Sequence, residues 1–416
     1  MIMRRIWEWN IAPYWYRVAG FLTVMFFILL SDAILSDFVP GYIQGITGSA
    51  AKMGWIMAVS SMVGIVMDLL FPQLLRRAGV KQLAGMAIVG ALVFILSLWG
   101  STWVLPIMLV LIGMAAWGVY YELDSFMTKQ FVAKVAPTHA RGMVWGVVGT
   151  FRNLAYLVGP IIGAMIVGLG DSKVIVSAGM ILLLAYSLFA LIKLPENEQL
   201  EEDNHGVSIV TEMKHWWTLA RVTWPVLAMS LLIGLVDAVF WTTGTVVNDV
   251  LAETNRYGGL FLSAYMLPSL FVGLAVAKWG IYKGKKHWSA IMLLMGGVVL
   301  AGITISQRIE WILGVVLISS IFMGLAWPLI DATYTDFTVR MGRGRKHMIG
   351  ISSSVLSLAY VVGPIVGGMM AEKVGELESF GWLGVLVASI ALLLLITMPR
   401  KIRLPENEIG NWDKNL

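Results

Sequence analysis

The sequence predicts an all-α integral membrane protein with twelve transmembrane helices arranged as two six-helix repeats. Three observations lead to this fold class: an apolar composition, a series of long apolar runs, and a phrase that occurs twice about half the chain length apart. The 416 residues are 58% hydrophobic and only 13% charged, with a mean hydropathy of +0.80. Soluble domains carry about 25% charged residues, so a soluble core would not absorb this sequence.

Each apolar run is long enough to cross the hydrocarbon core of a bilayer, which takes roughly 20 helical residues. The first run is longer than the roughly 7–15 residues of a signal-peptide core and shows no small-residue cleavage site, so we expect it to remain as the first span. The predicted spans lie near residues 17–39, 53–72, 82–100, 103–128, 141–169, 174–193, 222–246, 257–278, 288–306, 311–338, 346–371 and 381–399.

Basic residues are distributed unevenly among the loops. The even-numbered loops and both termini hold several Lys or Arg residues each, whereas the odd-numbered loops hold one each: Lys52, Lys173, Arg256, Arg308 and Lys373. The positive-inside rule therefore predicts that both termini are cytoplasmic, in a multi-pass protein of the cell (plasma or inner) membrane. The net charge of +5 follows from this topology and does not indicate a nucleic-acid partner.

The longest loop divides the predicted spans into two sets of six. Residues 194–221 are rich in acids, and we expect a solvated cytoplasmic linker there. The predicted domains are an N-terminal six-helix half at 1–193, this linker, and a C-terminal six-helix half at 222–416 that ends in a short cytoplasmic tail.

A duplicated phrase indicates that the two predicted halves are copies of one six-helix unit. LAYLVGPIIGAM at 154–165 lies in the fifth span, and LAYVVGPIVGGM at 358–369 lies in the eleventh. SDAIL around Asp32 in the first span corresponds to VDAVF around Asp237 in the seventh, and Trp117 corresponds loosely to Trp327. A parallel repeat of two six-helix halves is one of the known transporter architectures.

Glycine and proline recur at fixed spacing in both copies of the phrase. Glycines four residues apart allow two helices to approach closely, and a proline inside a helix removes a hydrogen bond and kinks it. We therefore predict close-packed, kinked helices that act as pivots between the halves. The helix-packing residues are Gly146, Gly159, Pro160, Gly163, Gly350, Gly363, Pro364 and Gly367.

On these motifs the chain resembles the major facilitator superfamily, and its Gly-Pro phrase resembles the span-5 motif of that superfamily's drug:proton antiporters. The resemblance covers nearly the whole chain. It implies the major facilitator fold, transport by alternating access, and a central cavity lined by spans 1, 4, 7 and 10. Two residues depart from the pattern: Arg76 stands where the superfamily carries an acid after span 2, and Met114 stands near the position of the drug exporters' span-4 arginine.

Eight acidic residues lie inside the predicted spans. Each would cost about 2.5–3.5 kcal/mol at the centre of a membrane helix if unpaired, so most must face water, form a pair or carry a proton. All but one lie on the four spans that line the cavity in proteins that resemble this family. The acids are Asp32, Asp37, Asp68, Glu122, Asp124, Asp237, Asp331 and Asp336.

Five of the membrane-embedded charges are candidates for coupling a proton to substrate. Asp32 and Asp237 lie near the midplane; Glu122, Asp331 and Arg152 complete the set. Each also has a structural interpretation as a partner that joins two helices. For Arg152 that partner would be Glu122 or Asp32, and the functional alternative is an anchor for an anionic group.

The remaining charges near the cytoplasmic face are candidates for a gate. Asp336 is expected to pair with Arg340 or Arg343, and Asp68 is expected to pack against the eleventh span. Arg76 and Arg77 follow the second span. Asp37 and Asp124 are expected to reach solvent.

Aromatic residues on the predicted cavity helices could contact a substrate. If they face the cavity they suit amphiphilic, sugar-like or cationic solutes, because a cation is attracted to an aromatic face. The alternative is that they pack against other helices or face lipid. The candidates are Trp117, Tyr121, Tyr156, Trp241, Trp327 and Tyr360.

Sequence motifs for other chemistries are missing. The chain has no cysteine, no phosphate-binding Gly-x4-Gly-Lys-Ser/Thr loop and no Gly-x-Ser-x-Gly nucleophile motif. No two of its five histidines show metal-site spacing with other ligands. We therefore expect no enzyme activity, no metal and no cofactor. The expected energy source is an ion gradient, with the proton as the expected ion.

These observations predict a secondary active transporter that exports small amphiphilic compounds in exchange for protons. The alternative is proton- or sodium-coupled uptake of a sugar or an organic acid on the same fold. A more remote alternative is a membrane receptor that transports nothing. The expected partners are the lipid bilayer and a small-molecule substrate, and the protein is expected to be a monomer.

Overall fold

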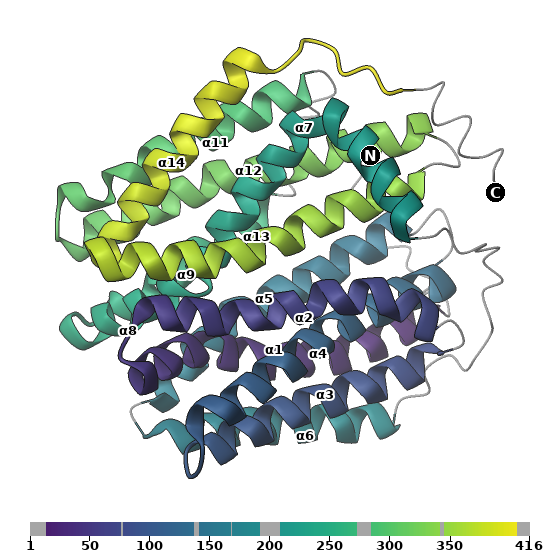
Figure 1. Cartoon of the computed structure of the whole chain (residues 1–416). Helices are drawn as coiled ribbons and strands as arrows, with labels where there is room; N and C mark the ends of the chain where they lie inside the picture. The colour runs from purple at the N-terminus through teal and green to yellow at the C-terminus, as the bar shows by residue number, and fades with distance from the viewer. Residues whose placement is uncertain are drawn as a thin grey trace, which may run out of the picture. The chain divides into compact units, whose positions relative to one another are not determined.

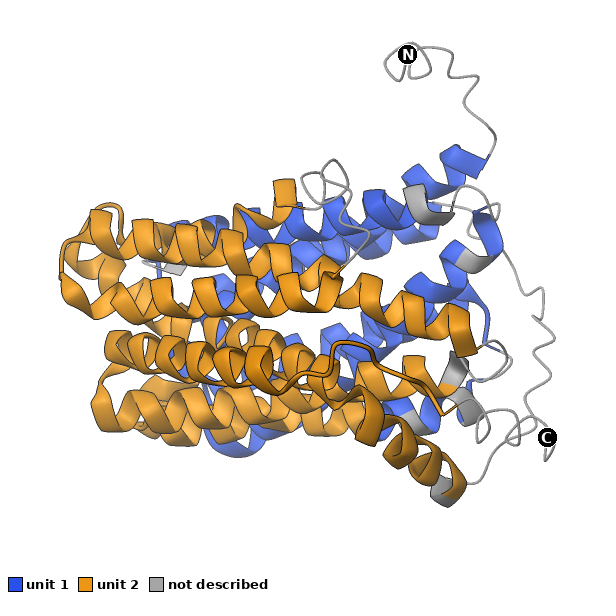
Figure 2. Ribbon diagram, turned by 90° about the horizontal axis from the view of Figure 1, so that it is seen from above, with its two compact units in different colours: residues 1–42, 66–200 blue, residues 43–65, 201–416 orange. Residues whose placement is uncertain are grey.

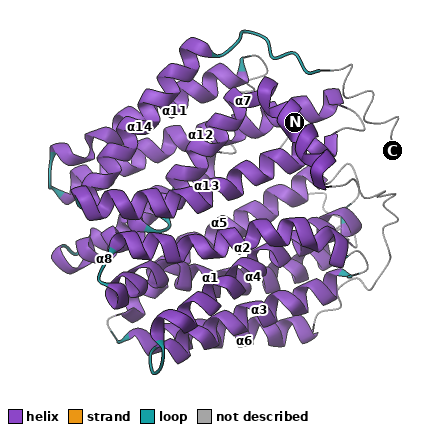
Figure 3. Ribbon diagram, viewed as in Figure 1, coloured by secondary structure: helices purple, strands orange, loops and turns teal. Residues whose placement is uncertain are grey.

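The protein was analysed as a computed structural model that describes residues 14–75, 78–136, 141–167, 169–191, 209–272, 284–341 and 345–405. Across these ranges the secondary structure consists of helices joined by short loops, with no strand (Figure 3). The all-α prediction is therefore confirmed for the described residues. The predicted gate residues Arg76, Arg77 and Arg343 lie outside them.

The first six helices follow the predicted spans closely (Figure 1). Most are longer than the apolar runs by several residues, because a helix continues into the polar residues at either membrane face. Their bounds are α1 (Tyr14–Thr47), α2 (Ala50–Leu74), α3 (Val80–Ser101), α4 (Pro106–Val135), α5 (Arg141–Val167) and α6 (Asp171–Leu191).

The second half of the chain departs from prediction at α7. This helix begins at Ile209, so the predicted linker at 194–221 is wrong in its last part, which is helical. The helix is interrupted within the predicted span at 222–246, where Thr242 leaves the helical conformation and its Oγ1 hydrogen-bonds the Ala238 carbonyl at 2.8 Å. The two parts together still form one candidate membrane span, Thr211–Thr254. The helices here are α7 (Ile209–Phe240), α8 (Thr243–Thr254), α9 (Phe261–Met266), α11 (Lys285–Ala301), α12 (Ile309–Met341), α13 (Arg345–Val374) and α14 (Glu376–Thr397), with 3-10 turns at Gly258–Leu260 and Gly302–Ile305.

Eleven helical segments of the described residues are long and apolar enough to cross a membrane. The predicted span at 257–278 corresponds to a shorter apolar segment, Gly258–Val272, and its remaining residues lie outside the described part. The chain is therefore a multi-pass membrane protein, and the count of twelve stays a prediction.

The chain forms two compact units (Figure 2). Unit 1 comprises Met1–Tyr42 and Val66–Leu200, and unit 2 comprises Ile43–Ile65 and Glu201–Leu416. Segment 43–65 thus belongs to unit 2, although the predicted N-terminal half contains it.

Segment 43–65 belongs to unit 2 because it packs tightly against α13. A Cβ added to Gly54 would lie 2.1 Å from the Pro364 carbonyl oxygen, so only glycine permits this approach. Nearby, the Ser49 hydroxyl and the Ala51 backbone N–H both donate to Oε2 of Glu372, at 2.6 and 2.8 Å. Close packing and charge-assisted hydrogen bonds therefore join the start of α2 to α13.

Within unit 2, apolar side chains from many helices form two core clusters. One includes Val226, Ile330 and Met348, and the other includes Phe240, Phe261 and Phe380. Small residues also allow α11 and α14 to pack closely, because a Cβ on Gly384 would lie 2.3 Å from the Ala301 backbone nitrogen. Such packing through small residues is typical of membrane helices, which have no hydrophobic driving force between them.

Candidate functional site

Asp32 of α1 lies at the centre of a polar cluster in unit 1. Its side chain is buried, with 5% of the residue exposed. Three neutral donors point to its carboxylate: Trp117 Nε1 donates to Oδ1 at 2.5 Å, and the hydroxyls of Tyr121 and Tyr156 donate to Oδ2 at 3.1 and 2.5 Å. These three aromatic candidates therefore point towards Asp32, and contact between them and a substrate stays a prediction.

The helical spacing of α4 explains two of the three donors. Trp117 and Tyr121 are four residues apart and therefore lie on one face of the helix. The Trp117 ring stacks on Phe94 of α3, with centroids 4.7 Å apart and planes 9° apart, which fixes the direction of its N–H. The third donor, Tyr156, comes from α5, so Asp32 joins three helices.

A second carboxylate in unit 2 has a similar environment. Asp237 of α7 accepts hydrogen bonds from the Tyr265 hydroxyl of α9 at 2.6 Å and from the Tyr360 hydroxyl of α13. Tyr360 occupies the position in the second copy of the duplicated phrase that Tyr156 occupies in the first. The same tyrosine-to-aspartate hydrogen bond is thus made in both units.

The glycines of the duplicated phrase explain how each tyrosine reaches its aspartate. A Cβ on Gly159 would lie 2.4 Å from Ala33 Cβ, and a Cβ on Gly363 would lie 2.6 Å from Ala238 Cβ. In each unit, therefore, the alanine that follows the aspartate packs directly against a glycine. This contact brings the two helices together three residues from the tyrosine.

The other glycines of the motif differ in their surroundings. Gly163 faces α1, with Asp37 Oδ2 at 3.3 Å from an added Cβ, and Gly367 faces Thr243 Oγ1 at 2.9 Å. Gly350 lies against the Trp216 indole, but Gly146 has open space around it, so a packing role is wrong for Gly146. Helices α5 and α13 both continue through their prolines, Pro160 and Pro364.

Arg152 of α5 pairs with Asp124 of α4, Nη2 to Oδ2 at 3.2 Å. The expected partners were Glu122 or Asp32, so this part of the prediction is wrong. The expectation that Asp124 reaches solvent is also wrong, because the residue is 4% exposed, and Asp37 is likewise buried. Residues 122 and 124 point to different sides of α4, and the packing of α5 against α4 selects Asp124.

Glu122 interacts instead with Asp68 of α2, carboxyl to carboxyl. Two adjacent carboxyl groups repel each other when both are ionised, so they share a proton or bind a cation. Residues predicted for two different roles, coupling and gating, are thus one pair in unit 1.

The predicted gate contacts of α12 are made with other partners. Asp336 pairs with Lys285 at the start of α11, with Nζ 2.7 Å from Oδ2, and not with Arg340 as expected. Arg340 donates to the Ile402 carbonyl at 3.4 Å. Asp331, a predicted coupling residue, is exposed on α12.

Trp327 and Trp241 are the two remaining aromatic candidates. Trp327 packs against the apolar cluster of unit 2 that contains Val226, as expected if this aromatic residue packs against other helices. Trp241 is half-buried beside the break between α7 and α8. Sequence reasoning missed Tyr265, which takes a donor position at Asp237; no spacing in the sequence connects residues 237 and 265, and only the fold brings them together.

The apolar helices define a multi-pass membrane protein. The sequence pattern of the Major Facilitator Superfamily matches residues 21–338 and 229–414, and the chain belongs to this family. This family is one of transporters and not of enzymes.

Individual proteins are similar to the chain at low identity. The multi-drug resistance efflux pump PmrA homolog of Lactococcus lactis subsp. lactis (strain IL1403) is 27% identical over 147 residues, which cover 34% of this chain and 35% of the relative. Multidrug resistance protein 1 of Bacillus subtilis (strain 168) is 26% identical over 176 residues, 42% of this chain and 43% of the relative. The chain thus spans less than half the length of these curated relatives.

Solved structures resemble the chain over most of its length. The crystal structure of a D-xylose-proton symporter covers 93% of this chain and 99% of its own, with a TM-score of 0.67 and 16% sequence identity. At this identity the likeness shows the fold, which agrees with the predicted major facilitator fold.

Proposed function

We propose that this protein exports small amphiphilic compounds, cations among them, in exchange for protons. In this proposal, Asp32 binds either a proton or the transported cation. The observation that carries the proposal is the set of donors around this carboxylate. All three described donors, Trp117, Tyr121 and Tyr156, are neutral. The charge of Asp32 is therefore balanced by what binds to it.

A carboxylate in such a setting can exchange a proton for a cation. Burial disfavours its charged form and the three hydrogen bonds favour it, so modest changes around the group decide whether a proton stays. A cationic solute that reaches the carboxylate supplies the same charge as the proton and replaces it. The aromatic side chains around Asp32 offer ring faces for the apolar and cationic parts of such a solute.

The Arg152–Asp124 pair supports this assignment. An arginine that paired with Asp32 would neutralise it permanently, and the arginine would then compete with a proton. Because Arg152 is paired with Asp124, Asp32 keeps its own charge available for exchange. Asp237, with its two tyrosine donors, is the corresponding group in unit 2.

The proposal includes the arrangement of the chain in the membrane. The chain would form twelve spans in two six-helix halves, with both termini in the cytoplasm, and would function as a monomer in the cell membrane. The similar proteins of L. lactis and B. subtilis are named as multidrug efflux or resistance proteins, which favours export. The alternative is coupled uptake of a sugar or organic acid, and the name of the structurally similar D-xylose-proton symporter favours it.

The test measures internal pH in proteoliposomes that contain the wild-type protein, while lipophilic cations such as ethidium or tetraphenylphosphonium are added outside. Export by exchange predicts that protons leave the compartment that the cation enters. Asp32→Asn should abolish this signal, and Asp171→Asn, at the exposed start of α6, should not.

Three results would contradict the proposal. Protons that enter together with the solute would mean symport. A response of Asp32→Asn equal to wild type would remove Asp32 from the coupling site. Cation transport without any proton movement would exclude proton coupling.

A further inference from the structure

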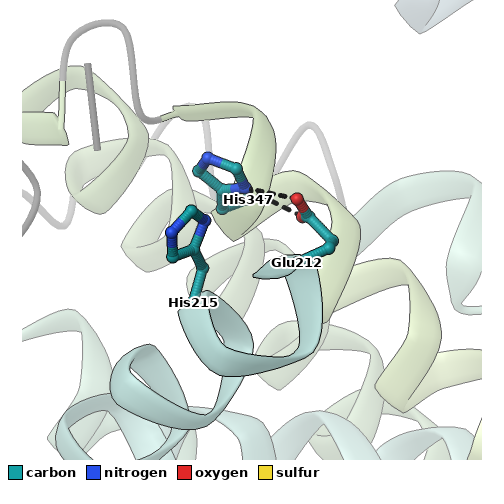
Figure 4. A group of neighbouring side chains, drawn as sticks. All are labelled: Glu212, His215 and His347. Atoms are coloured by element: carbon teal, nitrogen blue, oxygen red, sulfur yellow. Dashed lines mark hydrogen bonds and ion pairs between the residues drawn. The ribbon is translucent and has the colours of Figure 1, made fainter. Parts of the chain in front are cut away.

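Three side chains that bind metals well meet at the first turns of α7 and α13, in unit 2 (Figure 4). Glu212 and His215 come from α7, and His347 comes from α13. One ligand atom from each of the three lies within 4.8 Å of the others. The sequence does not predict this site, because the histidines show no metal-site spacing along the chain and His347 is far from Glu212 and His215.

We propose that Glu212, His215 and His347 bind one divalent transition-metal ion, with Zn²⁺ the expected ion, and that this ion fastens the start of α7 to the start of α13. This inference is independent of the transported substrate. It concerns a site at helix ends, whereas the transport proposal concerns carboxylates deep in the bundle.

The local structure brings the ligands to one place. Glu212 and His215 are three residues apart and lie on the same face of α7. His347 is almost fully buried, at 1% exposed, and its Nδ1 lies 2.8 Å from both carboxylate oxygens of Glu212. The rings of His215 and His347 approach edge to face, with centroids 4.6 Å apart and planes at 73°.

The ligand set is chemically suited to zinc. Two imidazoles and one carboxylate are a common combination at zinc sites that have three protein ligands and keep a fourth position for water. With metal–ligand bonds of about 2.0–2.2 Å, tetrahedral ligand atoms lie about 3.3–3.6 Å apart. The Nδ1–oxygen separation of 2.8 Å must therefore widen slightly, which small side-chain rotations allow.

A supporting residue orients the carboxylate, as is usual at metal sites. Trp216 Nε1 donates to Glu212 Oε1 at 2.7 Å. The indole fits there because residue 350 is a glycine: an added Cβ would lie 2.9 Å from Trp216 Cζ2. Outer-shell hydrogen bonds of this kind hold a ligand in its binding geometry.

The competing explanation is a hydrogen-bonded clamp without metal. Glu212 lies in the first turn of α7, where a negative charge is favoured by the helix dipole, and it already accepts from His347. Glu212 and His347 carry this explanation, and His215 contributes its ring contact with His347. A metal site requires the His215 imidazole for Zn²⁺ binding, whereas the clamp predicts no stoichiometric Zn²⁺ binding, so wild type and His215→Gln together separate the two explanations.

The experiment uses the purified full-length chain in detergent, with any polyhistidine tag removed. Zn²⁺ affinity and stoichiometry are measured by competition with a chromophoric chelator, and Co²⁺ is added separately to record its visible d–d absorption. The wild type should bind one Zn²⁺ per chain, and Co²⁺ should give a spectrum of low-symmetry nitrogen and oxygen coordination. Zn²⁺ should also raise the thermal unfolding midpoint, because a ligand that binds only the folded state stabilises it.

The variants identify the ligands. His215→Gln should weaken Zn²⁺ binding by more than the roughly 10–100-fold that loss of an outer-shell partner causes, and Trp216→Phe should fall within that range. His287→Gln, a histidine of α11 outside the cluster, is the matched control and should bind as the wild type does.

His215→Gln remains decisive even if substitution of buried His347 prevents folding, because His215 is only partly buried. The proposal is overturned if the wild type binds no stoichiometric Zn²⁺, or if His215→Gln and His287→Gln bind it equally. Elution volume and the metal-free unfolding midpoint verify that each variant is folded.

Discussion

Replacing Gly159 by alanine tests whether contact between α5 and α1 builds the Asp32 site. The new Cβ would lie 2.4 Å from Ala33 Cβ, 3.0 Å from Ala33 C and 3.2 Å from Ala33 Cα. Carbon atoms prefer separations of about 3.5–4.0 Å, so the nearest contact is short by about 1.1–1.6 Å. Because all three atoms are backbone or directly attached to it, the helices must separate to relieve the clash.

This separation has a calculable cost. Overpacking of a well-packed contact costs about 1–3 kcal/mol. If α5 moves by about 1 Å, the Tyr156–Asp32 hydrogen bond lengthens from 2.5 Å to beyond normal hydrogen-bond distance, and losing a hydrogen bond to a charged group costs about 1.5–3 kcal/mol. We therefore expect a total loss of about 2.5–6 kcal/mol, or about 1–3 kcal/mol if the hydrogen bond survives.

Gly146→Ala is the matched control, because it makes the same chemical change in the same helix where an added Cβ meets nothing within 4 Å. The change in helix propensity cancels in the comparison. The assay is the free energy of unfolding in mixed micelles, together with proton-coupled transport in proteoliposomes. Adding Ala33→Gly to Gly159→Ala removes the nearest atom and should recover part of the loss, a non-additive effect. Equal stability and transport of Gly159→Ala and Gly146→Ala would refute the reasoning.

Two further pairs of variants test the site. Trp117→Phe keeps the aromatic ring but removes the N–H donated to Asp32, so we expect a loss of about 1.5–3 kcal/mol in unfolding free energy and altered transport. Trp327→Phe, in an apolar cluster, should change stability but leave transport intact; equal transport defects would contradict this difference. Asp124→Asn removes the buried partner of an arginine and should cost more than the about 0–1 kcal/mol of an exposed pair. Asp336→Asn, whose side chain is 55% exposed, should stay within that range in the same unfolding assay.

Several features of the fold and the site could be predicted from the sequence because they depend on composition and local periodicity. Long apolar runs predict membrane helices in any tertiary arrangement. The duplicated phrase predicted that Tyr156 and Tyr360 correspond, SDAIL and VDAVF predicted the same of Asp32 and Asp237, and the structure places each tyrosine hydroxyl on the corresponding aspartate. The repeat also predicted close packing at Gly159 and Gly363, because small residues at fixed spacing can be recognised in a single sequence. Their alanine partners came from the structure.

Partner selection among charged residues could not be predicted in this way. Glu122 and Asp124 are two residues apart and thus about 200° apart around α4, so each faces a different neighbour. The sequence favours Glu122 or Asp32 as the partner of Arg152, but the rotation of α4 against α5 selects Asp124 and leaves Glu122 for Asp68.

The sequence by itself determined that this protein is a multi-pass membrane protein with aspartates and tyrosines at corresponding positions of a repeat, because hydrophobicity, charge bias and repetition are properties of the chain alone. Only the tertiary structure decided which groups meet across helices that are distant in sequence. Tyr265 reaches Asp237, and His347 reaches Glu212 and His215, because helix packing brings them within a few ångströms. No local pattern encodes these distances, since each depends on the rotation and axial shift of two packed helices.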